Sequence, residues 1–208
     1  MNELLYSGLG KLGLGDDEKL GKLETFLSEL MLFNPSYRLV SQTDERDIIV
    51  RHILDSAAAV PYLSSLNPDS VIDLGSGGGF PGIVLATLMD DVSFTFSERM
   101  ARRVSFLKNE VLLLSLKNVR VISDDSFNIS EKFPVATARG FHPVYDIYPE
   151  VAKLLAPGGR MVLYKGPGKN VEKEMAETEK RFGRIEYSII DISVPFLDEE
   201  RTLLVIEV

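Results

Sequence analysis

The chain has 208 residues, of which 45% are hydrophobic and 26% are charged, and its net charge at pH 7 is −8. This composition suits a soluble globular protein with an ordinary core, built as one domain with an appendage. No apolar run approaches the ~20 residues that span a bilayer, and the N-terminus lacks the basic and apolar regions of a signal peptide. We therefore expect a cytoplasmic protein without a membrane partner.

Residues 1–66 contain helical patterns and no convincing strand, and we interpret them as an N-terminal helical cap. Apolar residues recur at helical spacing over 20–31, and Pro35 is expected to interrupt this first helix. A second helix is predicted over about 44–63. An Asn-Pro-Asp turn then marks the boundary with a second domain, residues 67–208.

Strands and helices alternate in the second domain. The predicted strands are 70–74, 92–97, 119–123, 135–138 and 161–164, and the predicted helices start at 81, 100, 144 and 169. A Pro-Gly-Gly turn at 157–159 precedes the fifth strand. Right-handed crossovers give such a chain an α/β fold with a parallel sheet. The closing strands, 185–194 and 201–208, have no helix between them, which predicts an antiparallel last strand.

A glycine-rich loop follows the first strand. Residues 71–82 read VIDLGSGGGFPG: an apolar strand runs directly into Gly75, Gly77 and Gly79. Glycines let the backbone turn sharply and approach a ligand where a Cβ would collide, and Pro81 suits the first turn of a helix. The run predicts a nucleotide-cofactor site. The alternative is a tight turn between strand and helix that binds no ligand.

The register of the glycines distinguishes two cofactor classes. The Gly-x-Gly-x-x-Gly run of dinucleotide-binding enzymes usually begins directly after the strand, but here it matches only Gly77 to Gly82. The segment from Asp73 to Gly79 instead resembles the first motif of S-adenosylmethionine (SAM) methyltransferases. By this resemblance, Asp73 accepts a hydrogen bond from the ammonium group of the cofactor, directly or through water.

A second acidic residue follows the next strand. Glu98 lies 23 residues after Gly75, at the place where doubly wound folds carry the acid that binds the ribose hydroxyls. We predict this ribose contact for Glu98. The alternative is a surface acid near a helix N-terminus, where the helix dipole favours negative charge.

The segment from Glu98 to Arg120 is locally basic. It contains six Lys and Arg residues and two Glu residues, a local net charge of +4 in an acidic chain. Affinity for nucleic acid comes mostly from basic residues, so the negative net charge of the chain argues against a nucleic-acid partner. The local positive charge of this flank weakens that argument. The alternative is a solvated amphipathic helix with an apolar buried stripe.

Several segments together resemble the RsmG/GidB family. They are Arg51-His-Ile-Leu-Asp-Ser56, Gly79-Phe-Pro-Gly82, Arg102-Arg-Val-Ser-Phe-Leu107, Ala138-Arg139-Gly-Phe141, Lys165-Gly166 and Glu200-Arg-Thr-Leu-Leu-Val-Ile206. That family uses SAM to methylate ring nitrogen 7 of one guanine in bacterial small-subunit (16S) ribosomal RNA. The resemblance covers Phe33 to the C-terminus. It implies a class I SAM-dependent methyltransferase with a Rossmann-like sheet of seven strands, S-adenosylhomocysteine as product, no metal, and ribosomal RNA or a ribosomal particle as partner of a monomer.

The resemblance also implies roles for individual residues. Arg139 should lie at the reaction centre as the catalytic residue and also contact the cofactor; its alternative is a salt bridge to a surface acid. Further cofactor contacts are expected from Gly75, Phe80, Asp125, Ser126 and Phe127, and substrate contacts from Arg51, His52, Arg102, Arg103 and Lys165. Arg51 and Asp55, at i and i+4, could instead form a helix-stabilising ion pair. His52 could be a structural histidine.

Two segments depart from the family pattern. Arg38-Leu39-Val40 replaces Asn-Leu-Thr, and residues 125–127 replace an Arg-small-Glu run. The absence of cysteine excludes disulfides, thiolate zinc sites and a covalent adduct for methylation at carbon 5 of a pyrimidine, and no Asn/Asp-Pro-Pro-Tyr run is present for exocyclic amines. Two other interpretations stay open: a methyltransferase for a small molecule or protein, and a non-catalytic RNA-binding module that retains a SAM pocket.

Overall fold

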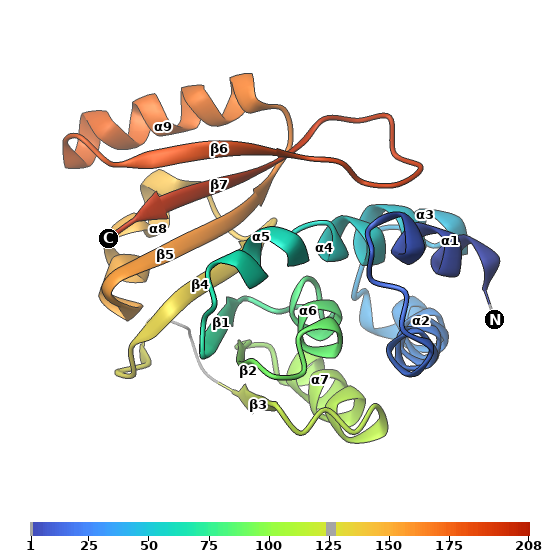
Figure 1. The fold of residues 1–208 in the computed structure, drawn as a ribbon. Coiled ribbons are helices and arrows are strands. Elements are labelled where there is room, and N and C mark those ends of the chain that lie inside the picture. Colours follow the sequence, from blue (N-terminus) through green and yellow to red (C-terminus); the bar gives the residue numbers. More distant parts are fainter. Residues whose placement is uncertain (1, 124–127) are drawn as a thin grey trace.

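The computed structural model describes residues 2–123 and 128–208, and in it seven strands form one sheet with helices on both faces (Figure 1). The strand order is β3-β2-β1-β4-β5-β7-β6. The strands are β1 (Ser70–Leu74), β2 (Ser93–Ser97), β3 (Val119–Ile122), β4 (Phe133–Arg139), β5 (Leu155–Lys165), β6 (Tyr187–Ile192) and β7 (Arg201–Glu207). The first five strands pair in parallel, whereas β7 runs antiparallel to both of its neighbours. The predicted α/β fold and its antiparallel last strand are confirmed.

The helices divide between the two faces of this sheet. They are α1 (Glu3–Lys11), α2 (Asp17–Tyr37), α3 (Glu45–Ile48), the π-helix η1 (Ile49–Leu54), α4 (Asp55–Ala57), α5 (Val60–Ser65), α6 (Gly82–Leu88), α7 (Ala101–Leu113), α8 (Val144–Leu154) and α9 (Gly168–Phe182). One apolar cluster joins the sheet to α6, α7 and the helices before residue 66, and a second joins it to α8 and α9. None of the helices in the described ranges combines the length and apolar character that a membrane-spanning helix needs.

Alternation along the strands decides which side chains reach each face. In β4, Val135 belongs to the cluster with the N-terminal helices, whereas Ala136 and Ala138 belong to the other cluster. Since successive side chains point to opposite faces, Arg139 points to the same side as Val135. In β5, Tyr164 lies on that side as well. The N-terminal helices therefore cover the face of the sheet on which Arg139 and Tyr164 lie, near the ends of β4 and β5.

Residues 1–66 share their core with the rest of the chain. Phe26 of α2 packs against Phe80 and Phe106, with ring centroids 5.2 and 6.5 Å apart. Leu5 and Ile53 belong to the same buried cluster as these rings. A separate cap domain over 1–66 stays a prediction.

Three predicted boundaries were wrong. The first helix runs through Pro35 to Tyr37, because a proline in the last turn removes only one backbone hydrogen bond. The helix expected over 44–63 is divided, since the π-helix interrupts it and α5 starts anew with a proline in its first turn. The turn at 157–159 lies inside β5, where a bulge opposite Phe133 and Val135 accommodates it.

Gly82 begins α6 at a position with no room for a side chain. A Cβ there would lie 2.5 Å from Oδ2 of Asp73 and 2.7 Å from the ring of Phe96, and both of these side chains are buried. We expect Gly82→Ala to lower the free energy of unfolding by about 1–3 kcal/mol, as overpacking does. Urea denaturation measures this change.

Gly21→Ala is the matched control, because it lies in α2 with no atom within 4 Å of its Cβ position. This substitution should leave stability unchanged or raise it by about 0.5–1 kcal/mol, since alanine is the better helix former. Equal effects of the two substitutions would contradict the packing described for Gly82.

Candidate functional site: the carboxyl edge of β1, β2 and β4

The glycine loop between β1 and α6 has the backbone that its sequence predicts. Gly75, Gly77 and Gly79 have φ angles of 65°, 56° and 94°, values that residues with a side chain rarely adopt. The amide of Ser76 donates to the carbonyl oxygen of Ser97, at 3.1 Å, so β2 holds the loop. A Cβ on Gly78 would lie 2.9 Å from the carbonyl oxygen of Leu39. The loop therefore fits between the strand edge and the segment after α2 only because position 78 is a glycine.

Glu98 supports this loop from the end of β2. One carboxylate oxygen accepts from the amide of Gly77 at 3.0 Å, and the other accepts from the amide of Met100 at 2.8 Å. The Nη1 atom of Arg103 lies 3.9 Å from the same carboxylate. Each oxygen has two lone pairs, so the carboxylate can still accept hydrogen bonds from a ligand. Glu98 therefore lies at the glycine loop, as its spacing predicts, whereas its ribose contact stays a prediction.

Asp73 lies beneath the loop and is fully buried. Neither carboxylate oxygen has a hydrogen-bond partner among the described residues, and the neighbouring hydroxyl of Ser76 donates to the backbone oxygen of Asp73 instead. Burial, the largest effect, raises the pKa of this carboxyl from 3.8 to about 7. A contact between Asp73 and a cofactor ammonium group stays a prediction.

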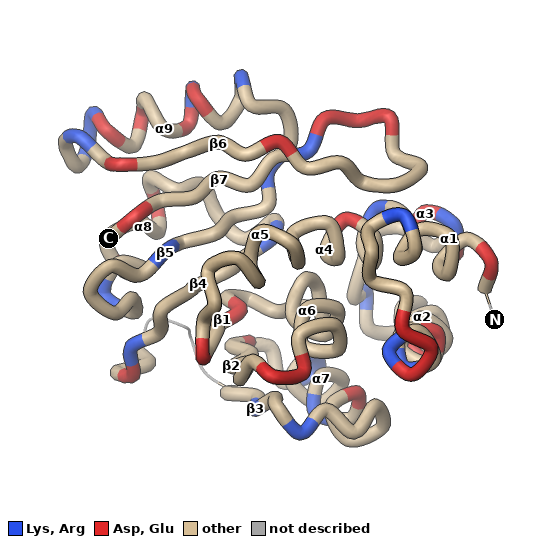
Figure 2. Tube along the Cα trace, viewed as in Figure 1, with Lys and Arg blue, Asp and Glu red and all other residues tan. Residues whose placement is uncertain are grey.

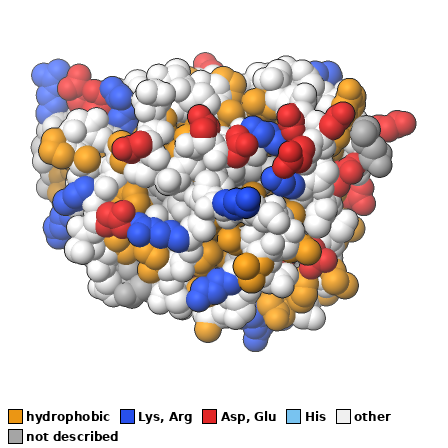
Figure 3. Space-filling view, turned by 60° about the horizontal axis from the view of Figure 1, so that its bottom comes forward, with side chains coloured by type: hydrophobic (Ala, Val, Ile, Leu, Met, Phe, Trp, Pro, Cys, Tyr) orange, Lys and Arg blue, Asp and Glu red, His pale blue; other side chains and the backbone are white. Residues whose placement is uncertain are grey.

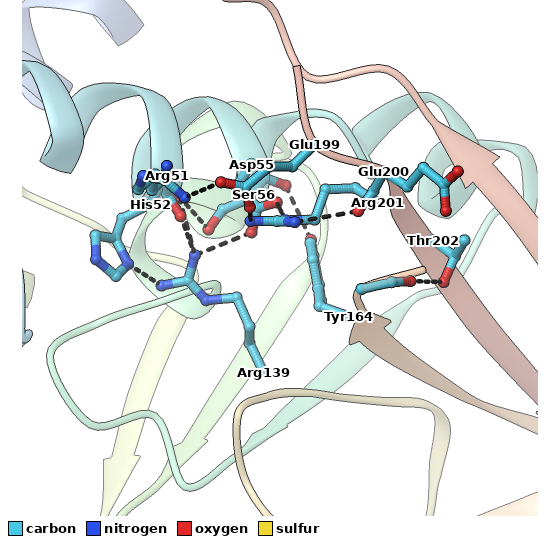
Figure 4. A network of polar contacts seen from close by, with 11 residues as sticks. Arg51, His52, Asp55, Ser56, Arg139, Tyr164, Glu199, Glu200, Arg201 and Thr202 are labelled. Atoms are coloured by element: carbon cyan, nitrogen blue, oxygen red, sulfur yellow. Dashed lines mark hydrogen bonds and ion pairs between the residues drawn. The ribbon is translucent and has the colours of Figure 1, made fainter. Parts of the chain in front are cut away.

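Arg139 extends from β4 into a cradle formed by η1 and α4 (Figure 4). Its Nη1 donates to the carbonyl oxygen of Arg51 at 3.0 Å and to Oδ2 of Asp55 at 3.1 Å. Its Nη2 lies 2.6 Å from Nδ1 of His52. The guanidinium also stacks on Phe80, with 5.0 Å from Cζ to the ring centroid. The salt bridge that the alternative predicts for Arg139 is present, but its acid is the buried Asp55 and not a surface residue.

Asp55 joins this cradle to β7. Its second oxygen accepts from Nε of Arg201 at 3.1 Å, and its side chain is only 5% exposed. Arg51 pairs with Glu199 at 2.7 Å and with Asp47 at 3.6 Å, not with Asp55. The alternative of an Arg51–Asp55 ion pair was therefore wrong. Since Asp55 turns toward the sheet, the two members of the expected pair have different partners.

Ser56 and Tyr164 complete the contact between helix and sheet. The Tyr164 hydroxyl donates to the carbonyl oxygen of Ser56 at 2.9 Å, and the Ser56 hydroxyl donates to the carbonyl oxygen of His52 at 2.6 Å. Every polar side chain of the Arg51–Ser56 motif thus has a partner in the folded protein. Sequence analysis did not assign roles to Tyr164, Arg201 or Gln42, because their partners are distant along the chain.

A cleft of about 460 Å³ lies between the glycine loop and this network. Its lining combines Gly75, Gly77, Phe80, Arg103 and Arg139 with residues of the N-terminal helices such as His52. A neighbouring pocket of about 610 Å³ shares Gly140, Tyr164 and Lys165 with the cleft and opens toward α8 and α9. Most of the predicted site residues are therefore brought together at one edge of the sheet.

The remaining predicted residues divide into three groups. Lys165 lines both pockets but is paired with Glu174, at 2.7 Å. Arg102 donates to the carbonyl oxygen of Ser36 and lies near the ring of Tyr37, outside the cleft lining. The predicted contacts of Asp125, Ser126 and Phe127 lie outside the described residues. Within the described part of the chain, acidic and histidine side chains form no group that could hold a metal ion.

The basic flank predicted from the sequence extends from the residues before α7, along that helix and the turn after it, to β3 (Figure 2). Figure 3 shows Lys and Arg side chains over one face of the molecule as separate spots among apolar, uncharged and acidic ones. The buried stripe expected for this helix is also present, since Val104 and Leu107 belong to the core. The amphipathic helix is therefore present, whereas a contact of this segment with nucleic acid stays a prediction.

Comparison with known proteins identifies relatives of this chain. A sequence model of the family described as "GidB: rRNA small subunit methyltransferase G" matches residues 19–204. A ribosomal RNA small subunit methyltransferase G from Treponema denticola is 34% identical over 99% of this chain and 94% of its own length. The protein of the same name from Coxiella burnetii is 32% identical over 98% and 97%. A structure from Methanococcus maripaludis, described as an S-adenosyl-L-methionine-dependent methyltransferase, shares the fold with a TM-score of 0.60, covering 86% of this chain and 90% of its own at 16% identity.

The raised pKa of Asp73 gives the protein a measurable pH dependence. Because the folded state binds this proton more tightly than the unfolded state, the contribution of Asp73 to stability should fall as pH rises from about 4 to 7. The slope is at most ~1.4 kcal/mol per pH unit for one group. We expect Asp73→Asn to remove this contribution, as measured by urea denaturation at several pH values. An unchanged slope would contradict a protonated Asp73 in the folded protein below pH 7.

Proposed function

We propose that this chain, which belongs to the rRNA small subunit methyltransferase G family, transfers a methyl group from SAM to ring nitrogen 7 of a guanine in bacterial small-subunit ribosomal RNA. The observation that carries the proposal is the cleft that joins the glycine loop after β1 to Arg139 at the end of β4. Open α/β sheets bind ligands at this edge. The choice of nitrogen 7 rests on the resemblance to the family.

The residues at this edge fit SAM. The loop glycines, which adopt positive φ angles, have no side chain, so a ligand can approach the backbone there. Glu98 keeps lone pairs that can accept from ribose hydroxyls. We propose that Gly75, Gly77, Gly79, Phe80 and Glu98 hold the cofactor, together with Asp73 and the segment 125–127. When bound, SAM supplies an electrophilic methyl group on a sulfonium. The chain holds this group in a fixed orientation at the cleft.

The chemistry of the acceptor limits what the protein must do. Ring nitrogen 7 of guanine carries a lone pair and no proton, so transfer needs alignment at ~3 Å and no general base. Burial, followed by the charges of Arg139 and Arg51, lowers the pKa of His52 to about 3, which suits a neutral structural role near neutral pH. This observation supports a mechanism without proton transfer.

Arg139 has donors left for the ligands. Among the described residues, its Nε hydrogen and one Nη2 hydrogen have no acceptor, while the others are bound in the cradle. Positive charge develops on guanine during transfer, so a cation directly at nitrogen 7 would oppose the reaction. We propose that Arg139 contacts the cofactor, the neighbouring O6 or a phosphate.

The acceptor nucleotide has space beside the cofactor. The 610 Å³ pocket shares Lys165 with the cleft and presents the rings of Phe141 and His142, which lie 4.5 Å apart. Lys165 is held in place by Glu174. We propose that the RNA approaches across this pocket and across the basic flank with Arg102 and Arg103, while Arg51 and His52 border the cleft. We also propose that the protein acts in the cytoplasm as a monomer, on free RNA or on a ribosomal particle.

Transfer of labelled methyl groups tests the proposal. The acceptor is small-subunit RNA, free or in particles, from a strain that lacks the family's enzyme. We expect one new 7-methylguanosine by nucleoside mass spectrometry. Protein that binds SAM but modifies neither form of the RNA would contradict the proposal and favour a small-molecule acceptor or a non-catalytic module.

Arg139→Ala should lower kcat/KM for this transfer by about 100-fold, because a positioned donor is lost. Asp55 keeps Arg201 as a partner in this variant, so the fold should survive, which thermal unfolding checks. Arg160→Ala is the control: it breaks an ion pair with Glu207 outside both pockets and should leave transfer unchanged. A pH-rate profile governed by one essential enzyme base would contradict the mechanism.

A further inference from the structure

Gln42 contacts the imidazole of His52 on the side opposite Arg139. Its side-chain oxygen lies 2.6 Å from Nε2 of His52, while Nδ1 of His52 lies 2.6 Å from Nη2 of Arg139. The three side chains form a chain of hydrogen bonds from the segment after α2, through η1, to the end of β4. Gln42 and Arg139 both line the cleft.

The two contacts determine the protonation of the imidazole. A guanidinium has only donors, so Nδ1 of His52 must accept from Arg139 and cannot carry a proton. The proton therefore lies on Nε2, where the amide oxygen of Gln42 accepts it. If Nδ1 carried a proton instead, His52 would present an N–H to the N–H of the guanidinium, and two donors would face each other.

We infer that Gln42 is a positioning residue that acts through His52 to orient the guanidinium of Arg139 for methyl transfer. The inference rests on the proposed function, in which Arg139 serves the reaction. Holding Nη2 on one side leaves the Nε hydrogen and the second Nη2 hydrogen for the ligands. The π-helix is in keeping with this role, since such turns often occur at functional sites.

Hydrogen bonds tie the segment that carries Gln42 to α2. The side-chain amide of Asn34, a buried residue of α2, donates to the carbonyl oxygen of Gln42 at 3.0 Å, and its oxygen accepts from the amide of Val40 at 2.9 Å. The hydroxyl of Ser41 donates to the side-chain oxygen of Gln42 at 2.8 Å, the oxygen that faces Nε2 of His52. His52 is held from below by the ring of Phe80, with centroids 5.0 Å apart.

Charged groups surround the imidazole on several elements. Arg139 approaches from β4 and Arg51 lies beside it on η1, while Asp55 binds the far side of the Arg139 guanidinium. Glu199 and Arg201 extend this network from the segment before β7 and from its first residue. Two cations near the ring favour its neutral form. A negative charge at position 42 would oppose that preference.

Kinetics of two substitutions test the inference. Gln42→Leu removes the acceptor and should lower kcat/KM for methyl transfer by about 10- to 100-fold, as misplacement of a reacting group does. Gln42→Glu keeps the acceptor but favours imidazolium, whose Nδ1 hydrogen faces Arg139. It should transfer methyl groups well at pH 8.5 and lose activity toward pH 6, a limb that the wild type lacks. Thr43→Ala, at an exposed neighbour outside the cleft lining, is the control. Wild-type rates for Gln42→Leu would overturn the inference.

Nitrogen-15 spectra of the imidazoles provide a readout that needs no turnover. The chain has two histidines, and His142→Asn leaves the signal of His52 alone. The inference requires protonated Nε2 and unprotonated Nδ1 from pH 8 to 5 in the wild type, and a positively charged imidazole in Gln42→Glu toward the acid end of this range. A proton on Nδ1 in the wild type would overturn it. If the wild type transfers no methyl group, the proposed function fails, whereas the spectrum still decides whether Gln42 sets the state of His52.

Discussion

The site depends on the contact between the buried carboxylate of Asp55 and two guanidinium groups. Asp55 accepts from Arg139 of β4 and from Arg201 of β7, and its side chain is almost inaccessible to solvent. Removing one partner of a buried ion pair typically costs about 3–5 kcal/mol, because the remaining charge stays in a poorly solvated place. With two arginines, the carboxylate keeps one partner when the other is lost. The contact joins the N-terminal helices to two strands that are not neighbours in sequence.

This contact makes the N-terminal helices part of the site instead of an appendage. Backbone oxygens of η1 bind Arg139, the hydroxyl of Tyr164 binds the backbone of α4, and Leu39 touches the glycine loop. The same helices share one apolar core with α6 and the sheet. A displacement of these helices would therefore alter the orientation of Arg139 as well as the packing of the core.

The two carboxylates at the carboxyl edge of β1 and β2 differ in how well their hydrogen bonds are satisfied. Asp73 is buried without a hydrogen-bond partner among the described residues, an arrangement that costs free energy in the charged state. Proteins tolerate such costs at functional sites, where selection acts on activity as well as stability. Glu98, by contrast, is satisfied by two backbone amides, which fixes both the carboxylate and the glycine loop before any ligand binds.

The sequence by itself determined the alternation of strands and helices, the conformation of the glycine loop and the approach of Glu98 to it. These features depend on local periodicity, on the steric freedom of glycine and on spacing within one βαβ unit. Only the tertiary structure decided the partners of Arg51, Asp55 and Arg139, the division of the helix over 44–63 and the contact of Gln42 with His52. These depend on contacts between residues up to 146 positions apart, such as Asp55 and Arg201, which leave no local pattern.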